Sequence, residues 1–293
     1  MTVAILFIVH WQLSVFCQSF FLHRYGAHRQ FTMSRGWERF FNLLTYLAQN
    51  SGYMNPRGYA ILHRMHHAYS DTPRDPHSPT NHAWLIPGLF DMMWLTKRTY
   101  HDLAYFEQAP EARFEGDTPS WPLIDRMGES WALRIVWGAA FFAFYWHFAT
   151  TPWLWVLLPG HWMMGAMHGA IVNWSGHRYG YRNFELNDAS RNTLPIDFVT
   201  AGELCQNNHH KRATSPNFAV RWFELDTTYQ VIRVLAWLRV IDLRDCSKGW
   251  SIKSSGRARA CVRARHAIRL PASRPPSPGL STRWPRRSPA RRR

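Results

Sequence analysis

Three long apolar segments stand out along the chain and predict helices that cross a membrane. Residues 3–22 read "VAILFIVHWQLSVFCQSFFL", a length that suits a hydrocarbon core of roughly 30 Å. Residues 131–149 and 153–172 are separated only by Thr150, Thr151 and Pro152. So short a connection predicts a helical hairpin that turns on one side of the bilayer. Arg134, near the start of the hairpin, can extend to the other side.

A shorter apolar segment, residues 40–54, contains Asn42, Gln49 and Asn50. Its length and polar positions predict an interfacial or re-entrant helix that does not cross. Residues 3–22 could instead be a secretory signal. No basic stretch precedes them and no small-residue cleavage site follows, so we expect an anchored span. The first span should end just before His23, so that residues 23–134 and everything after Trp174 share one side.

The distribution of charge indicates which side this is. The net charge is +16, but residues 246–293 contain 14 Lys and Arg and no Asp or Glu, so the preceding residues are nearly balanced. The loops on the shared side hold nearly all the remaining Lys and Arg, which predicts the cytoplasmic side. The expected fold class is all-α: a membrane-embedded bundle of about three to four transmembrane helices, with a cytoplasmic helical cap.

The basic tail, residues 246–293, is expected to be separate from the membrane domain, residues 1–245. It is rich in Arg, Pro and Ser and has no apolar periodicity, which is typical of disorder. Such a tail could attract anionic lipid or nucleic acid, but its abrupt loss of acids fits an aberrant, frame-shifted terminus equally well. We therefore expect no nucleic-acid partner. The four cysteines lack CxxC spacing, so no zinc knuckle or redox pair is indicated.

Histidines recur where the apolar segments leave the membrane. Eight of them form four clusters on the predicted cytoplasmic side: His23, His28, His63, His66, His67, His177, His209 and His210. On a helix, the i, i+3, i+4 spacing of residues 63–67 places three rings on one face, and Gln206 begins the same spacing before His209. Asn173 and His177 are also i, i+4. Six of the other histidines are expected to be ordinary polar residues: His10, His82, His101, His147, His161 and His168, the last of which could line a cavity.

His23 and His28 do not fit the spacing of an α-helix. Five residues correspond to about 140° around an α-helix, so the two rings cannot point the same way on one straight helix. Either the helix ends near Gly26, or the two rings reach different metal ions.

The number of histidines bears on the metal. Imidazole suits zinc, copper, iron and nickel alike. Eight imidazoles exceed what one tetrahedral zinc can use, and a catalytic zinc keeps only three protein ligands. Two metal ions, each with four or five nitrogen ligands and an open position, use the set economically. The sequence therefore favours a dinuclear iron site over a zinc hydrolase site.

Four motifs in series, HRxxxHR, HRxHHxxSDxxxDPH, NxxxHxYGYR and GE…NNHH, resemble the integral-membrane fatty acyl desaturases of the stearoyl-CoA (Δ9) type. The resemblance covers about Phe20 to Ile241. It implies a non-haem di-iron enzyme that uses O₂ as co-substrate, with the eight histidines as metal ligands and catalytic residues and Asn173 orienting a metal-bound water. Asp71, Asp75 and Glu203 are expected either to orient the imidazoles or to be ordinary acids at the surface or at helix ends.

The chain departs from this family at three points. Gln206 stands where the family usually has histidine; its amide oxygen could bind iron weakly, or a water could fill the position. Ile61 and Leu62 stand where many acyl-CoA members have Arg-Asp, so the acyl carrier could be CoA, a carrier protein or a membrane lipid. The family commonly has another span before the first motif, so either the start is mis-assigned or three spans suffice.

The expected function is therefore O₂-dependent desaturation of a long-chain acyl substrate. No His-Pro-Gly-Gly stretch and no Gly-rich nicotinamide-binding turn is present, so electrons should come from a separate ferredoxin, flavoprotein reductase or cytochrome. A fatty acyl or lipid hydroxylase on the same scaffold is one alternative. A non-catalytic membrane protein that binds metal or lipid is another.

Overall fold

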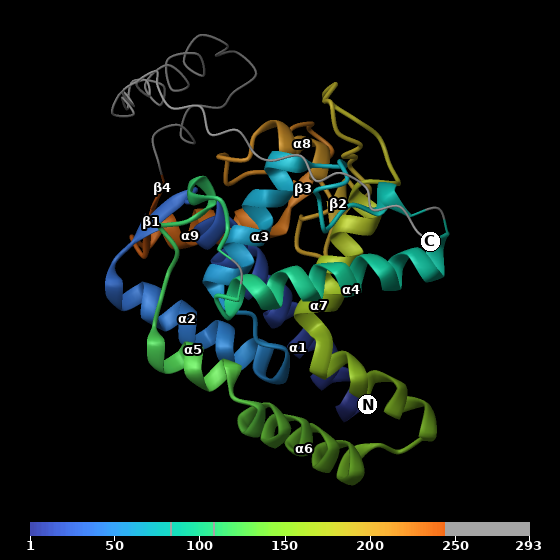
Figure 1. Cartoon of the computed structure of the whole chain (residues 1–293). Coiled ribbons are helices and arrows are strands. Elements are labelled where there is room, and N and C mark those ends of the chain that lie inside the picture. Colours follow the sequence, from blue (N-terminus) through green and yellow to red (C-terminus); the bar gives the residue numbers. More distant parts are fainter. Residues whose placement is uncertain (83, 108, 244–293) are drawn as a thin grey trace, which may run out of the picture. The chain divides into compact units, whose positions relative to one another are not determined.

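The structure, a computed structural model, describes residues 1–82, 84–107 and 109–243 and is mostly helical (Figure 1). The predicted all-α class is confirmed. The longer helices are α1 Thr2–Cys17, α2 Arg35–Gln49, α3 Pro56–Tyr69, α4 Leu85–Ala104, α5 Pro122–Glu129, α6 Trp131–Phe148, α7 Leu158–Gly176, α8 Gln206–Lys211 and α9 Thr227–Trp237. The predicted tail, residues 246–293, and its boundary at residue 245 lie outside the described residues.

Short elements complete the fold. They are the π-helix η1 Gln18–Ala27 and the 3₁₀ segments η2 Asn50–Gly52, η3 Pro79–Asn81, η4 Ala112–Phe114 and η5 Pro152–Leu157. Strand β1 Phe31–Met33 pairs antiparallel with β4 Ile241–Leu243, and β2 Ile196–Asp197 pairs parallel with β3 Leu225–Asp226. Residues 178–205 contain no helix, so this part of the predicted helical cap is irregular.

The first helix continues past His23 and ends at Ala27, next to Gly26, which was one of the two possibilities raised by the spacing of His23 and His28. The α1 helix continues directly into η1, where the His28 N–H bonds to the His23 carbonyl at 3.1 Å, five residues back. All ten residues of η1 are buried. The buried Arg24 has partners inside the protein: its guanidinium donates to the Pro216 carbonyl and pairs with Asp226 at 3.1 Å.

One helix in the described part of the chain, Thr2–Ala27, has the length and apolar composition needed to cross a membrane. The number of crossings therefore stays a prediction. The hairpin partners α6 and α7 do pack against each other. However, residues 153–157, predicted as helix, belong to η5. Pro159 lies in the first turn of α7, where the missing N–H is tolerated, and this is why the helix begins only at Leu158.

The interfacial segment forms α2, whose N-cap Ser34 accepts a hydrogen bond from the Trp37 N–H. Arg134, expected to extend to the other side of the bilayer from the hairpin turn, has three backbone partners near the start of α6. Its guanidinium donates to the carbonyls of Gly128, Ser51 and Tyr53, each at 2.9 Å. The start of α6 is thereby tied to the turn that follows α2.

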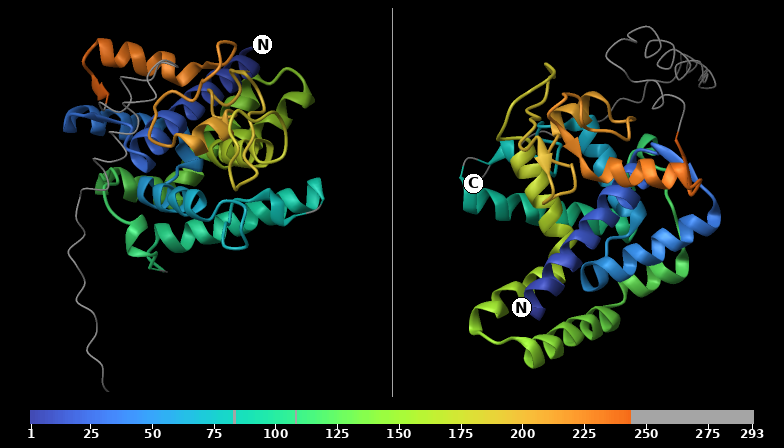
Figure 2. Two further views of the ribbon diagram at one scale, coloured as in Figure 1. Left: turned by 90° about the horizontal axis from the view of Figure 1, so that it is seen from above. Right: turned by 180° about the vertical axis from the view of Figure 1, so that it is seen from behind.

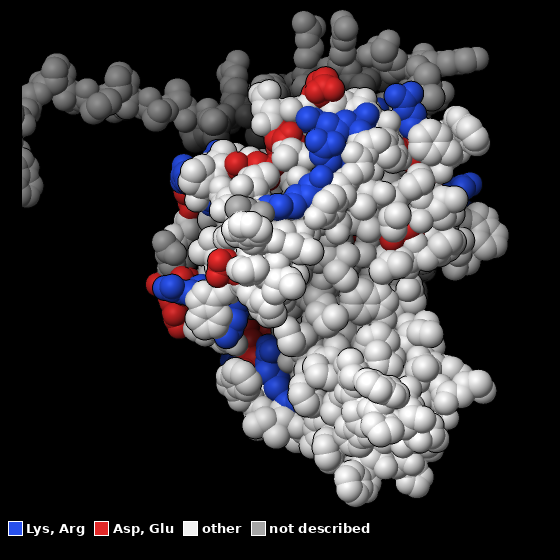
Figure 3. All heavy atoms as spheres, turned by 90° about the vertical axis from the view of Figure 1, so that its right-hand side faces the viewer, with Lys and Arg blue, Asp and Glu red and all other residues white. Residues whose placement is uncertain are grey.

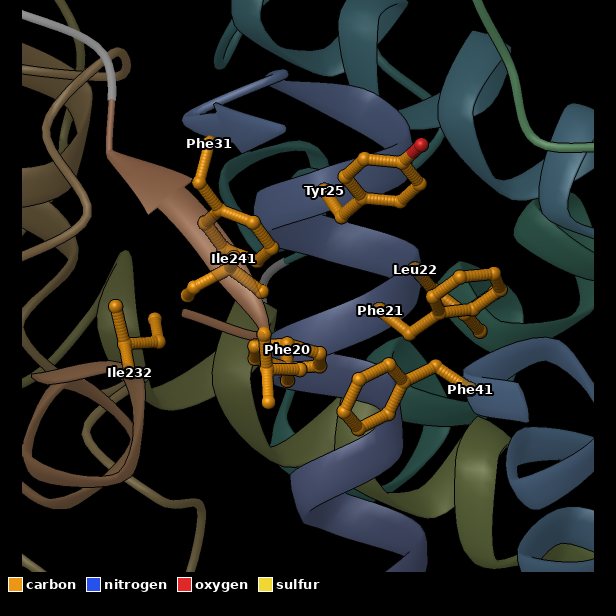
Figure 4. Close-up of a cluster of buried hydrophobic side chains, with 9 residues drawn as sticks. Phe20, Phe21, Leu22, Tyr25, Phe31, Phe41, Ile232 and Ile241 are labelled. Atoms are coloured by element: carbon orange, nitrogen blue, oxygen red, sulfur yellow. The ribbon is translucent and has the colours of Figure 1, made fainter. Parts of the chain in front are cut away.

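The largest cluster of buried apolar side chains surrounds η1. Phe20, Phe21 and Leu22 lie between Phe41 of α2 on one side and Ile241 of β4 on the other (Figure 4). Ile232 brings α9 against the same cluster, so the C-terminal elements cover the π-helix from behind (Figure 2). This packing fixes the segment from which the first histidines project.

Candidate metal centre

Three histidines from three different elements converge on one point. His66 of α3, His177 after α7 and His210 of α8 have ligand nitrogens within 4.8 Å of one another. We call them the three-histidine group. Each ring is held from behind by a carboxylate at its Nδ1: His66 by Asp75 at 2.9 Å, His177 by Asp71 at 2.9 Å and His210 by Asp188 at 3.0 Å.

The opposite nitrogens of these rings have no protein partner. The Nε2 atoms of His66, His177 and His210 are buried, and none makes a hydrogen bond to any described residue. Buried polar atoms are rarely left without a partner. A carboxylate on one imidazole nitrogen and a metal ion on the other is the usual arrangement of metal-binding histidines. The three-histidine group therefore fits a metal ion.

Five further histidines form a second group next to the first. We call His23, His28, His63, His67 and His209 the five-histidine group; their ligand nitrogens also lie within 4.8 Å of one another. Neighbouring Nε2 atoms are 2.8 Å apart for His28 and His63, 2.9 Å for His63 and His67, and 3.0 Å for His23 and His209. The Nε2 atoms point inward at a common centre, as ligands of one ion would.

The structure thus brings all eight predicted histidines together, and the π-helix explains the first two. Bonds from i to i+5 add a residue to each turn, so His23 and His28 stand one turn apart and enter the same group. Adjacent histidines separate instead. His67 joins the five-histidine group while His66 joins the three-histidine group, and His209 and His210 divide in the same way.

Burial keeps most of these rings neutral. Loss of solvation, reinforced by repulsion from the neighbouring rings and arginines, lowers the pKa of His28, His63, His67 and His209 well below the usual value. Neutral imidazole has the free lone pair that a metal needs. Desolvation also opposes charge on Glu203, but the nearby His23 outweighs it and lowers the pKa of this carboxyl to about 2.

All three predicted acids contact a histidine of the site. Besides Asp71 and Asp75, Glu203 lies 2.6 Å from the Nδ1 of His23. The sequence analysis missed two further residues. Asp188 comes from the irregular segment before β2 and has no spacing signal. His77 is half-buried, with its ring centroid 5.6 Å from that of His66, and the motif containing His66 already included it.

Gln206 lies beside the three-histidine group. It is one helical turn before His210 on α8. Its Nε2 donates to the Glu203 backbone carbonyl at 2.8 Å, so its Oε1 points away from that carbonyl. A Cβ added to Gly176 would be 2.4 Å from the Gln206 Cγ. Glycine there lets the Gln206 side chain lie against the backbone next to His177. Asn173, one turn before His177, donates to the Gly169 carbonyl at 2.8 Å.

A cavity of about 530 Å³ extends from these residues along α7. His63, Asn173 and Gln206 line it at the metal centre, and Gly165 and Trp162 line it farther along the helix. Its wall is mostly apolar, and the buried His168 is part of it, as the sequence analysis allowed. Among the other histidines, His82, His101 and His147 lie outside both groups.

Comparison with known proteins agrees with this geometry. The profile of the family described as "Fatty acid desaturase" matches residues 1–236, which is most of the chain. The chain belongs to the fatty acid desaturase family. The sequence-based prediction of an acyl desaturase, and hence of an oxidoreductase, is confirmed at the level of this family.

Its relatives act on differently carried acyl groups. The chain is 29% identical to hex-5-enoyl-[acyl-carrier protein] acetylenase from Moorena producens, over 78% of this chain and 72% of the relative. It is 27% identical to acyl-CoA 5-desaturase AL21 from Anemone leveillei, over 76% and 65% of the two chains. It is 28% identical to sn-1 stearoyl-lipid 9-desaturase from Synechocystis, over 74% and 63%. The chain therefore spans about two thirds of the length of these curated relatives.

Proposed function

We propose that this desaturase introduces a double bond into a long-chain acyl substrate, using two iron ions held by the two histidine groups. In the overall reaction, two hydrogens leave adjacent methylene carbons. O₂ takes up these hydrogens together with two electrons and two protons from outside, giving two molecules of water. The observation that carries the proposal is the three-histidine group. In each of its rings the Nδ1 contacts a carboxylate, while the buried Nε2 has no hydrogen-bond partner among the described residues.

The donor set suits the proposed metal. Imidazole nitrogen is a ligand that iron accepts. Bound iron would supply the redox chemistry that reduces O₂. His23, His28, His63, His67 and His209 would hold one ion, while His66, His177 and His210 would hold the other. Gln206, next to His177, would offer its amide oxygen to the second ion. Asn173, whose side chain lies in the cavity wall one turn before His177, would orient a water beside the ions.

The protein's own contribution is mainly to position groups and exclude water. Asp71, Asp75 and Asp188 accept hydrogen bonds from the Nδ1 atoms, which fixes each ring with its Nε2 forward. The mostly apolar cavity holds the acyl chain beside His63 and Asn173 and keeps water from the reacting carbons. The acyl carrier is CoA, a carrier protein or a lipid, since the relatives use each of these.

Topology follows from where apolar and charged side chains gather. Ile135, Val136 and Trp146 of α6 are exposed, and the part of the surface that contains α6 carries almost no charge, whereas charges gather around the histidine-bearing elements (Figure 3). We assign α6 and α7 to the membrane together with α1, in an integral multi-pass arrangement. The metal centre then faces the cytoplasm, where a ferredoxin, flavoprotein reductase or cytochrome delivers electrons.

The test is the fatty-acid profile of a desaturase-deficient host that expresses this chain with a reductase system. New monounsaturated acids are expected, with about two irons per purified chain. The His66→Ala variant is the matched negative control, because it removes one ligand of the three-histidine group. New hydroxy acids would support a hydroxylase instead, and a chain without iron and without product would refute the proposal.

A further inference from the structure

A pair of histidines outside the metal centre links three apolar helices. His10 of α1 and His161 of α7 are buried, and their Nδ1 atoms are 2.6 Å apart. The Nε2 of His161 lies 2.9 Å from the hydroxyl of Tyr145 on α6. The Nε2 of His10 lies 2.7 Å from the Ala48 carbonyl and 2.8 Å from the amide nitrogen of Asn50. Both histidines have ordinary polar partners, as expected, but the proposed reaction uses neither.

These contacts form one continuous chain of hydrogen bonds. Tyr145 can donate to His161, His161 to His10 through their Nδ1 atoms, and His10 to the Ala48 carbonyl. The reverse order also works, with Asn50 donating to His10. Both orders satisfy the two neutral rings. Since a polar group without a partner is costly among apolar helices, α1, α6 and α7 must keep the spacing that preserves this chain.

The chain of hydrogen bonds adjoins the wall of the cavity. Ser51 and Gly52, which directly follow Asn50, line the cavity, and so do Trp162 and Met163, which directly follow His161. The two stretches touch, because a Cβ on Gly52 would lie 2.9 Å from the Trp162 carbonyl oxygen. Asn50 has a φ of 40°, in the left-handed region, and its side-chain oxygen accepts from the Ser51 N–H at 2.6 Å.

This part of the wall is remote from the metal centre. The cavity follows α7 from Asn173 through Gly169 and Gly165 to Trp162. At a rise of about 1.5 Å per residue, the eleven residues from Asn173 to Trp162 correspond to about 16 Å along the helix. An acyl chain that lies in this cavity and reacts beside Asn173 would extend one of its ends toward Trp162 and Gly52, and we take this to be the methyl end.

We propose that His10 and His161 are positioning residues that set the depth of the cavity and thereby the length of acyl chain that the enzyme prefers. Their contacts hold the Ser51–Gly52 turn against the start of α7, so the wall at this end stays closed. The inference rests on the proposed function, because it requires an acyl chain in the cavity.

The test is a competition between palmitoyl and stearoyl substrates, with the full-length, iron-containing protein and its electron donors. The His161→Leu variant should raise the stearoyl-to-palmitoyl product ratio at least about tenfold, because an apolar pocket discriminates even one methylene by about tenfold and these substrates differ by two. His161→Gln should retain a ratio closer to wild type, since an amide can both donate and accept. The matched control is His147→Leu, which changes an exposed histidine of α6 and should leave the ratio unchanged.

The outcomes separate this inference from the proposed function. An iron-containing His161→Leu protein with an unchanged product ratio, even at reduced total activity, would show that the pair is only structural and would overturn the inference. If His161→Leu loses iron, Tyr145→Phe decides instead: it removes one hydroxyl and should move the ratio in the same direction, while an unchanged ratio overturns the inference. A wild-type protein that contains iron and receives electrons but forms no product would refute the proposed function itself.

Discussion

Asp188 allows the sharpest test of how the three-histidine group works. Its carboxylate accepts from the Nδ1 of His210 at 3.0 Å and is held in turn by the Ser190 N–H, also at 3.0 Å. Changing Asp188 to Asn keeps the shape but removes the negative charge, and the amide can turn an N–H toward the ring. The His210 Nε2 would then carry the proton and no longer offer a lone pair to a metal.

The size of the effect follows from this arrangement. Removing the carboxylate that holds a metal-binding histidine typically lowers metal affinity by about 10- to 100-fold, or about 1.4 to 2.8 kcal/mol at 1.4 kcal/mol per tenfold change. Only one of the three rings in the group loses its carboxylate. The five-histidine group contains no ring held by Asp188, so we expect its affinity to change little.

Metal titration measures this directly. Purified apo-protein is equilibrated with buffered ferrous iron, and bound iron is counted at each free concentration. Asp188→Asn should bind a first ion like the wild type and a second ion 10- to 100-fold more weakly. The matched control is Glu185→Gln, in the same segment, where the side chain is 95% exposed. Equal weakening of both ions, or wild-type binding of both, would refute the reasoning.

Four further predictions follow from the same centre. His66→Ala should abolish turnover and leave about one ion per chain; retained turnover would exclude the three-histidine group from the site. Gln206→His should give equal or higher iron occupancy, and a drop in measured iron would show a specific role for the amide. Burial lowers the pKa of His210 from 6.5 to about 4. Its contribution to the stability of the apo-protein is therefore complete above pH 6.5 and is lost as the pH falls toward 4. The melting temperature of the apo-protein should fall as the pH is lowered through this range, and a flat profile would contradict the shift. Removal of residues 246–293 should preserve activity in the expression assay, whereas lost activity would assign the tail a role.

The sequence predicted the members of the metal centre because local spacing determines them. The i, i+4 spacing of His63 and His67 holds on α3, and both rings meet in one group. Helical spacing could not predict that His66 would turn to the other group, because the partner rings His177 and His210 come from distant elements. Asp188 was missed for the same reason: its contact with His210 is tertiary, and it lies in an irregular segment.

The errors in the helices have local causes. An α-helical period does not align His23 with His28, and the expected first span ends where polar residues begin. In the structure those polar residues are buried among protein partners, which lets the helix continue. Pro159, by contrast, was a visible signal that residues 153–157 would not belong to α7.

If α1 crosses a membrane, the π-helix also determines how deep the histidine groups lie in it. The sixteen residues of α1 rise about 24 Å, somewhat less than a hydrocarbon core of roughly 30 Å. If α1 crosses the bilayer, the first turn of η1 completes the crossing, and His23 emerges at the boundary between hydrocarbon and headgroups. An acyl chain could then reach the site without leaving the apolar layer, while a water-soluble electron donor approaches the same site from the aqueous phase.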